Sequence, residues 1–348
     1  MKKIAISLCA LALMVGAVSC KKDKIDPIAE EDPVPVYAEG IYHPTLKIAT
    51  VSEDGELTQQ WNWVGDNLDQ IVATNGENVT YNYSGNYISK VTTAGDRAEE
   101  IRYYYDGSNA FQSCEIYYDG VKALTMLFTH NAAGKISSAD VTIEDSFLLS
   151  LAGDLLGFDS SFEKLLGRPA TESMIAMAKI AHAKGTKFSV GEKVVTANLE
   201  WAGENVANLM LQASVTLTLD TNDLNLVQQF LPIPEEYLPI IQMAMTYGGG
   251  LPLTLALNDT ISSTYDTNYN PMFCNWGMMV SPENLSLNNI LTQTNKGAVS
   301  VKVSMMGQSM DLLNNPMVDY TEYLYQYNDK KYPTRVSGDA EREYTYIQ

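Results

Sequence analysis

The sequence predicts an α+β fold, in which a large antiparallel β-meander forms a curved sheet and a few helices pack on one of its faces. Near both ends of the chain, aromatic residues alternate with polar ones beside Gly, Asp and Asn turns, which is typical of hairpins. The middle holds segments with apolar residues at helical spacing. These segments lack the regular strand and helix alternation of a parallel sheet, so an antiparallel sheet is favoured.

A short unit recurs along the chain and predicts the hairpins. It consists of an aromatic residue, a turn containing Gly, Asp or Asn, and two apolar residues three positions apart. Residues 63–71 align with residues 83–91, and residues 201–209 fit the same pattern. Looser copies begin at Tyr105, Phe128 and Tyr327. The turn supplies the positive φ angles that short hairpins need, and the apolar residues return as the partner strand.

This unit, repeated about every twenty residues, resembles the YD or RHS-type repeat. The chain is also similar to the lipoproteins of Bacteroidota that carry such repeats. The resemblance covers residues 61–141 and 325–346, with an isolated copy at 201–209. It implies hairpin geometry and identifies no functional residue.

The rings of these hairpins are the first candidate binding surface. Exposed on one face of a sheet, they would stack on sugars or contact a partner protein. Buried, they would stabilise the meander as cross-strand pairs, and we favour this interpretation for most of them. The candidate residues are Trp61, Trp63, Tyr81, Tyr83, Tyr103 and Tyr105.

The middle of the chain, residues 144–317, is rich in methionine and lacks tyrosine over its first half. Helices are expected over residues 144–157, 174–182 and 237–245, and strands over residues 188–219 and 299–303. The methionines either fill a core between the helices and the sheet or line an apolar pocket for a lipid. Core filling is the commoner case.

The first twenty residues form a secretory signal. Lys2 and Lys3 precede an apolar stretch at residues 4–18, and a small-residue cleavage site ends at Cys20. This arrangement resembles the lipobox of bacterial lipoproteins, although Ala17 stands where leucine is usual. The resemblance implies that Cys20 becomes the first residue of the mature chain and carries the acyl groups that anchor it.

Three regions are expected: a signal peptide at residues 1–19, a flexible acidic tether at residues 20–40, and a single domain at residues 41–348. The tether is polar and contains Pro27, Pro33 and Pro35, so it lacks the apolar residues of a core. The likeness to Bacteroidota lipoproteins implies an outer-membrane location, with the domain facing the periplasm or the cell surface.

Composition excludes two broad classes. Of the 348 residues, 45% are apolar and 19% charged, which excludes a disordered chain. The 23 Lys and Arg against 42 Asp and Glu give a net charge of −19, which argues against nucleic acid as a partner. Cleavage of the signal would remove two lysines and leave −21 on a body tethered to a membrane.

Few residues indicate chemistry. The sequence has no H-x-x-x-H, C-x-x-C or G-x-S-x-G motif, so neither a metal site nor a cofactor is predicted. Calcium at Asp-Gly turns is a weaker alternative. Cys114 and Cys274 either pair as a disulfide or lie buried as free thiols. Adjacent carboxylates such as Glu99 and Glu100 would point to opposite faces of a strand.

The leading hypothesis is a non-enzymatic, membrane-anchored lipoprotein whose β-sheet surface recognises a partner protein or a glycan. The alternative is a carrier, in which the curved sheet and the helices enclose an apolar cavity that holds a lipid. A third hypothesis is a hydrolase that uses scattered carboxylates. A continuous cavity would favour the carrier, and clustered carboxylates with raised pKa values would favour the enzyme.

Overall fold

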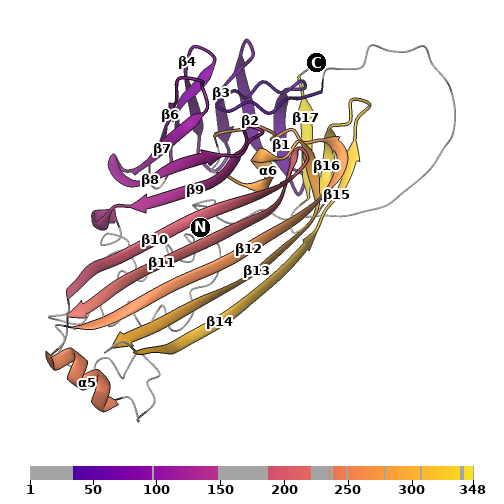
Figure 1. The fold of residues 1–348 in the computed structure, drawn as a ribbon. Helices are drawn as coiled ribbons and strands as arrows, with labels where there is room; N and C mark the ends of the chain where they lie inside the picture. Colours follow the sequence, from indigo (N-terminus) through magenta and orange to yellow (C-terminus); the bar gives the residue numbers. More distant parts are fainter. Residues whose placement is uncertain are drawn as a thin grey trace.

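A computed structural model describes residues 34–147 except 96–97, residues 187–220, residue 235, residues 238–247, and residues 250–347 except 278–279, 306–307 and 338–340. Within these residues, seventeen strands join in one antiparallel sheet (Figure 1). The helices with described bounds are α5 (Leu238–Tyr247) and the single turn α6 (Pro282–Leu285). The described chain is therefore nearly all β, and the predicted α+β class is wrong.

The strands fall into two length classes. The short strands are β1 (Ile48–Glu53), β2 (Glu56–Val64), β3 (Asn67–Ala73), β4 (Val79–Ser84), β5 (Tyr87–Thr93), β6 (Glu99–Tyr105), β7 (Phe111–Tyr118), β8 (Val121–His130), β9 (Ile136–Ile143), β15 (Leu324–Tyr327), β16 (Pro333–Ser337) and β17 (Arg342–Tyr346). The long strands are β10 (Lys187–Ala202), β11 (Asn205–Asp220), β12 (Leu251–Tyr269), β13 (Asn288–Met305) and β14 (Gln308–Glu322).

The long strands explain why the fold-class prediction failed. They occupy most of the described part of the middle region. The strands expected over residues 188–219 and 299–303 lie in β10, β11 and β13, and the sheet also takes in residues 251–269 and 308–322, which the sequence patterns do not predict as strands. In β12, Leu251 and Leu253 are buried while Pro252 and Thr254, which alternate with them, are only half-buried, which is the two-residue period of a strand. The helix expected over residues 237–245 is α5. The one expected over residues 174–182 lies outside the described residues, as does that over 144–157 from residue 148 onward.

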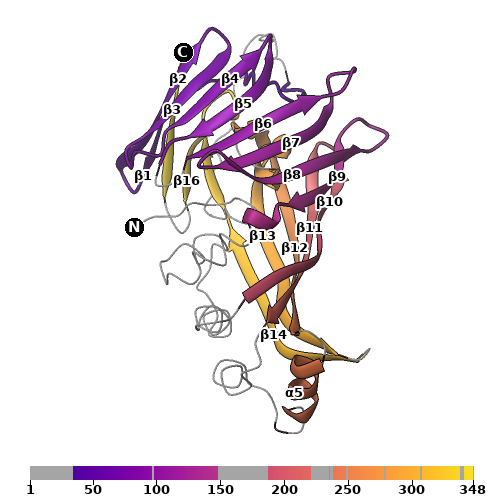
Figure 2. The same cartoon turned by 90° about the vertical axis from the view of Figure 1, so that its left-hand side faces the viewer.

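Strand pairing closes the part of the sheet that contains the short strands into a ring. Strands β1 to β14 pair in chain order. The chain passes from β14 to β15 through Tyr323 alone, and β15, β16 and β17 pair in turn. Strand β17 then pairs with β1, which places Tyr346 opposite Ile48. Figure 2 shows the short strands gathered at one end of the molecule.

The long strands extend the sheet beyond this ring. Figure 1 shows β10 to β14 lying side by side and running from the ring toward α5. Strand β9 pairs with β10 only at Thr196 to Asn198 of β10, and within the described chain β14 forms a ladder with β13 alone. The extension is consequently a five-stranded sheet with open edges at β10 and β14.

A bulge after each turn gives the hairpins their sequence pattern. In β2–β3, Asn62 pairs with Gln70 and Trp63 pairs with Leu68, so Asp69 is an extra residue between them. In a regular strand, residues three apart face opposite sides, but the bulge turns both Leu68 and Ile71 into the interior. The copy at residues 83–91 has the same register shift.

At seven of the bulges, an aromatic side chain links the bulge to a neighbouring strand. The indole or phenol donates to the carbonyl oxygen of the residue just before the extra residue of the bulge, a group that the interrupted ladder leaves available. The bonds are Trp63 to Ile48 (2.8 Å), Tyr83 to Leu68 (2.8 Å), Tyr105 to Ile88, Trp201 to Ile136 (2.7 Å), Tyr265 to Val206 (2.5 Å), Tyr325 to Ile290 (2.8 Å) and Tyr346 to Pro333 (2.6 Å).

Two irregular segments, residues 37–44 and 270–287, fill the ring. Inward tyrosines satisfy their polar groups: Tyr42 donates to the carbonyl of Pro271 (2.7 Å) and Tyr81 donates to the side chain of Asn275 (3.0 Å). Trp276 is 2% exposed, and its indole donates to the carbonyl of Ala38 (3.2 Å). The interior is therefore a packed core in which the two segments meet.

Close packing at Gly40 gives the first prediction. Gly40 has φ +70°, and a Cβ there would overlap the Tyr105 ring. Gly55 has φ +82° with nothing near its Cβ position. We expect Gly55→Ala to cost about 1–2 kcal/mol from backbone strain alone, and Gly40→Ala to cost a further ~1–3 kcal/mol from the overlap. Urea unfolding of both variants measures the difference in the free energy of unfolding. Equal destabilisation of the two variants would contradict the close packing of Gly40 against Tyr105.

Candidate functional site

The structure places the candidate aromatic residues inside the ring. Trp61, Tyr81 and Tyr103 are at most 8% exposed, and Trp63, Tyr83 and Tyr105 are half-buried with their polar atoms bonded to backbone carbonyls. The three buried rings present no stacking surface to solvent, and the other three are held by their hydrogen bonds to the backbone. Their role in the structure is to build the core and to join neighbouring hairpins.

The two cysteines of the domain are free thiols. Cys114 and Cys274 are both buried, and burial raises the pKa of each to about 12. Thiols held in this neutral form are poor nucleophiles. The predicted lipidation site Cys20 lies outside the described residues.

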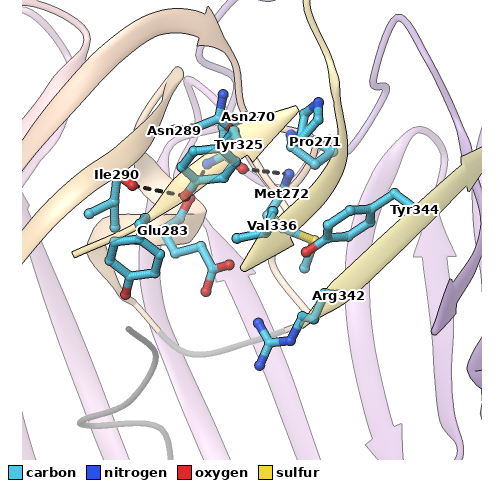
Figure 3. Close-up of a pocket in the computed structure, with 12 residues that line it drawn as sticks. Asn270, Pro271, Met272, Glu283, Asn289, Ile290, Tyr325, Val336, Arg342 and Tyr344 are labelled. Carbon is cyan, nitrogen blue, oxygen red and sulfur yellow. Dashed lines mark hydrogen bonds between the residues drawn. The ribbon is translucent and has the colours of Figure 1, made fainter. Parts of the chain in front are cut away.

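A polar pocket lies between α6, the C-terminal strands and the segment around residue 270 (Figure 3). Its polar lining includes Asn270, Glu283, Asn289, Tyr325, Arg342 and Tyr344. Figure 3 shows the Glu283 carboxylate and the Arg342 guanidinium extending toward the same side. The cavity volume is about 30 Å³, which is room for about two water molecules.

Burial sets the electrostatics of this pocket. It raises the pKa of Glu283, and the positive charge of Arg342 opposes that effect. Arg342 is itself held by Glu53, to which its Nε donates at 2.9 Å. Tyr325 donates its hydroxyl to the carbonyl of Ile290. The pocket can hydrogen-bond water, but its volume excludes an organic substrate.

A second buried carboxylate fixes the N-terminal segment. The Glu39 side chain is 5% exposed and accepts hydrogen bonds from Tyr37 (3.0 Å) and from the backbone of Phe111 (2.6 Å), and it lies 2.9 Å from His130 Nε2. The sequence assigns Glu39 to the tether, and no local pattern distinguishes it from the other acidic residues there. Its partners lie on β7 and β8, so only the tertiary structure reveals the cluster.

The adjacent carboxylates Glu99 and Glu100 lie on opposite faces of β6, as the strand period predicts. Burial raises the pKa of Glu99 to about 7, with a smaller opposing effect from Tyr118. Partial burial also raises the pKa of Glu100, but hydrogen bonds from Arg102 and Lys90 outweigh it and the net shift is downward. The pair therefore lacks the shared site of two catalytic carboxylates.

The exposed edge of the extension is the second candidate site. Val318 and Tyr320 on β14 are 68% and 62% exposed, whereas most large apolar side chains of the described chain are buried. Asp319 and Glu322 are exposed beside them. One feature of the sequence points to this edge, because a proline within a strand, here Pro316, is typical of an edge strand.

Within the described residues, no group of three or more His, Cys, Asp and Glu side chains could hold a metal ion. The Asp106-Gly107 turn illustrates the alternative use of such residues, because Asp106 Oδ1 accepts hydrogen bonds from Ser108 and Ala110 in its own turn. Among the described helices, none has the length and apolar character needed to cross a membrane.

Comparison with known proteins does not assign a family. Neither a protein-family model nor a curated protein matches the sequence. A solved structure found by comparison is a porin-like protein from Bacteroides uniformis ATCC 8492, which is 12% identical; the alignment covers 80% of this chain and 95% of that chain with a TM-score of 0.23. A TM-score this low does not indicate a shared fold or a shared function.

The contrast between Glu99 and Glu100 gives the second prediction. Folded Glu99 titrates near pH 7 instead of 4.5, so the native state binds more protons than the unfolded state across that window and stability falls as the pH rises. Glu99→Gln should therefore be more stable than the wild type at pH 8, by about 1–3 kcal/mol, and equal to it at pH 4.

Glu100→Gln is the matched control with the opposite sign. Because the pKa of Glu100 is lowered, its stabilising contribution is present above pH 4.5 and lost as the pH falls through the folded pKa. This variant should be slightly less stable than the wild type at pH 8, by about 0.5 kcal/mol. Thermal unfolding at both pH values tests the pair, and the same sign for both variants would contradict the assignment of faces.

Proposed function

We propose that the protein is a lipid-anchored, non-enzymatic module of the cell envelope that binds a partner protein at the open edge of β14. The observation that carries the proposal is the contrast between the two parts of the sheet. The ring is closed and filled, whereas β14 continues past it with an unpaired edge in the described chain and with Val318 and Tyr320 exposed. Long exposed edges are sites of protein association.

A protein partner fits this surface better than a glycan. Sugar recognition uses aromatic rings exposed for stacking, whereas the six candidate rings of the hairpins are buried or half-buried. Exposed backbone and isolated apolar side chains at a sheet edge are groups that another polypeptide can pair with. The acidic composition also favours a partner over direct contact with an anionic membrane surface.

The carrier and hydrolase hypotheses gain no support from the described residues. Three cavities lined by them have volumes of about 30, 10 and 60 Å³, far below the several hundred cubic ångströms that a lipid needs. The carboxylates with raised pKa values, Glu99 and Glu283, line no common pocket. A binding role therefore explains more of the geometry.

Site-specific crosslinking tests the binding edge. A photoreactive amino acid at position 318 should give a protein adduct in intact cells, whereas the same residue at position 64 should not. Val64 is the matched control because it is equally exposed, at 68%, but it is the last residue of β2 and lies in the closed ring of strands. Detection is by a mass shift on immunoblots. Equal adducts at both positions, or none at 318, would contradict the proposal.

Anchoring is tested at Cys20. Cys20→Ala should move the protein from the membrane fraction to the soluble fraction, because the acyl chains supply the attachment and the net charge opposes it. Intact-mass measurement of the wild-type protein should show a mature chain that begins at Cys20 with acyl groups added. An unmodified Cys20 in membrane-bound protein would overturn the anchor.

A further inference from the structure

The direction of the backbone groups of β14 follows from Pro316. Proline has no N–H to give to a ladder, so within a sheet it occupies a position whose nitrogen faces the open side. Pro316 pairs with Ala298 of β13, and the register continues without a shift to Val318 opposite Lys296 and Tyr320 opposite Thr294. Backbone direction alternates along a strand, so Val318 and Tyr320 also direct their N–H and C=O groups to the open edge.

The side chains on this edge have two kinds of chemistry. Val318 and Tyr320 share one face of the sheet with Glu322, and Asp319 lies between them on the other face. All four are exposed. Beside the outward backbone groups, the edge therefore offers apolar contact on one face and negative charge on both.

A second copy of this chain does not fit the edge. If two β14 strands paired antiparallel over their full length, Gln308 would lie opposite Glu322 and Asp311 opposite Asp319, once at each end of the interface. Like charges directly opposite destabilise a strand pair. Lys302, which bonds Asp311 at 3.2 Å, lies on β13 of the same chain, so both copies would bring the same acidic side chains to the shared edge.

We propose that β14 binds an extended segment of a partner protein that adds to the sheet as a further antiparallel strand and carries basic and apolar side chains in a set order. This inference rests on the proposed function and specifies its partner. Read against β14 from residue 322 down to residue 318, the segment carries five residues in this order: basic, any, apolar, basic and apolar. The apolar pair meets Tyr320 and Val318, and the basic pair meets Glu322 and Asp319.

The test uses the lipidated protein purified in detergent and two synthetic peptides. One contains the core Lys-Thr-Val-Lys-Val, and the other replaces both lysines with glutamate. Calorimetry should show that the basic peptide binds at least about tenfold more tightly. In the other peptide, each glutamate repels an acidic side chain of β14 that the lysine would attract. Higher salt should weaken its binding. Equal affinity of the two peptides would overturn the proposal.

Variants of β14 separate backbone pairing from side-chain contact. Val318→Pro removes an outward N–H without removing a β13 hydrogen bond and should weaken the basic peptide about tenfold. Val318→Thr keeps the N–H and should bind nearly as the wild type does. A double charge reversal, Asp319→Lys with Glu322→Lys, should reverse the peptide preference, and it remains informative if Val318→Pro fails to fold. Unchanged preference in the reversed protein would overturn the proposal.

The outcomes also distinguish this inference from the proposed function. A crosslink at position 318 without selective peptide binding would leave a partner at the edge but exclude strand addition by a basic segment. Absence of both would remove the binding edge altogether. Sedimentation showing that the protein dimerises, and that the basic peptide dissociates the dimer, would identify a second copy as the occupant and overturn the inference.

Discussion

The ring depends on one interaction, the hydrogen bond from an inward aromatic side chain to the carbonyl at a neighbouring bulge. Bulges are needed because they turn both apolar residues of each repeat into the interior, yet each bulge interrupts the ladder and leaves a backbone carbonyl to be satisfied. Tyrosine and tryptophan supply apolar volume together with a donor at the end of the ring system. The same residue therefore fills the core and repairs the ladder, as Tyr83 does for Leu68.

Filling the ring follows from the same constraint. A ring of this many strands encloses more space than the side chains of its own wall can fill. The segments at residues 37–44 and 270–287 occupy that space, and because they are irregular their polar groups need partners. Tyr42, Tyr81 and the Glu39 cluster provide them. The segment that leads from the expected membrane anchor is thus held within the core.

A filled ring limits where a ligand can act. The polar pocket beside Glu283 is water-sized, and the aromatic rings that face the interior of the ring of strands, such as Trp61, Tyr81 and Tyr103, are buried. Among the described residues, only the extension of β10 to β14 combines long strands with open edges, and β14 adds exposed apolar and acidic side chains to a backbone edge that has no partner strand there. The proposed binding role and its strand-addition mechanism both come from this asymmetry between a closed and an open part of one sheet.

The sequence by itself determined the local structure of the hairpins, because a turn, a bulge and a pair of apolar residues three apart act within about twenty residues. It also predicted a signal peptide and lipidation at Cys20, and its net charge argued against nucleic acid as a partner. Ring closure joins Ile48 to Tyr346, and the Glu39 cluster joins the N-terminal segment to His130, so neither has a local pattern. Whether the aromatic rings face inward and which strand keeps an open edge depend on these distant pairings. Only the tertiary structure decided them.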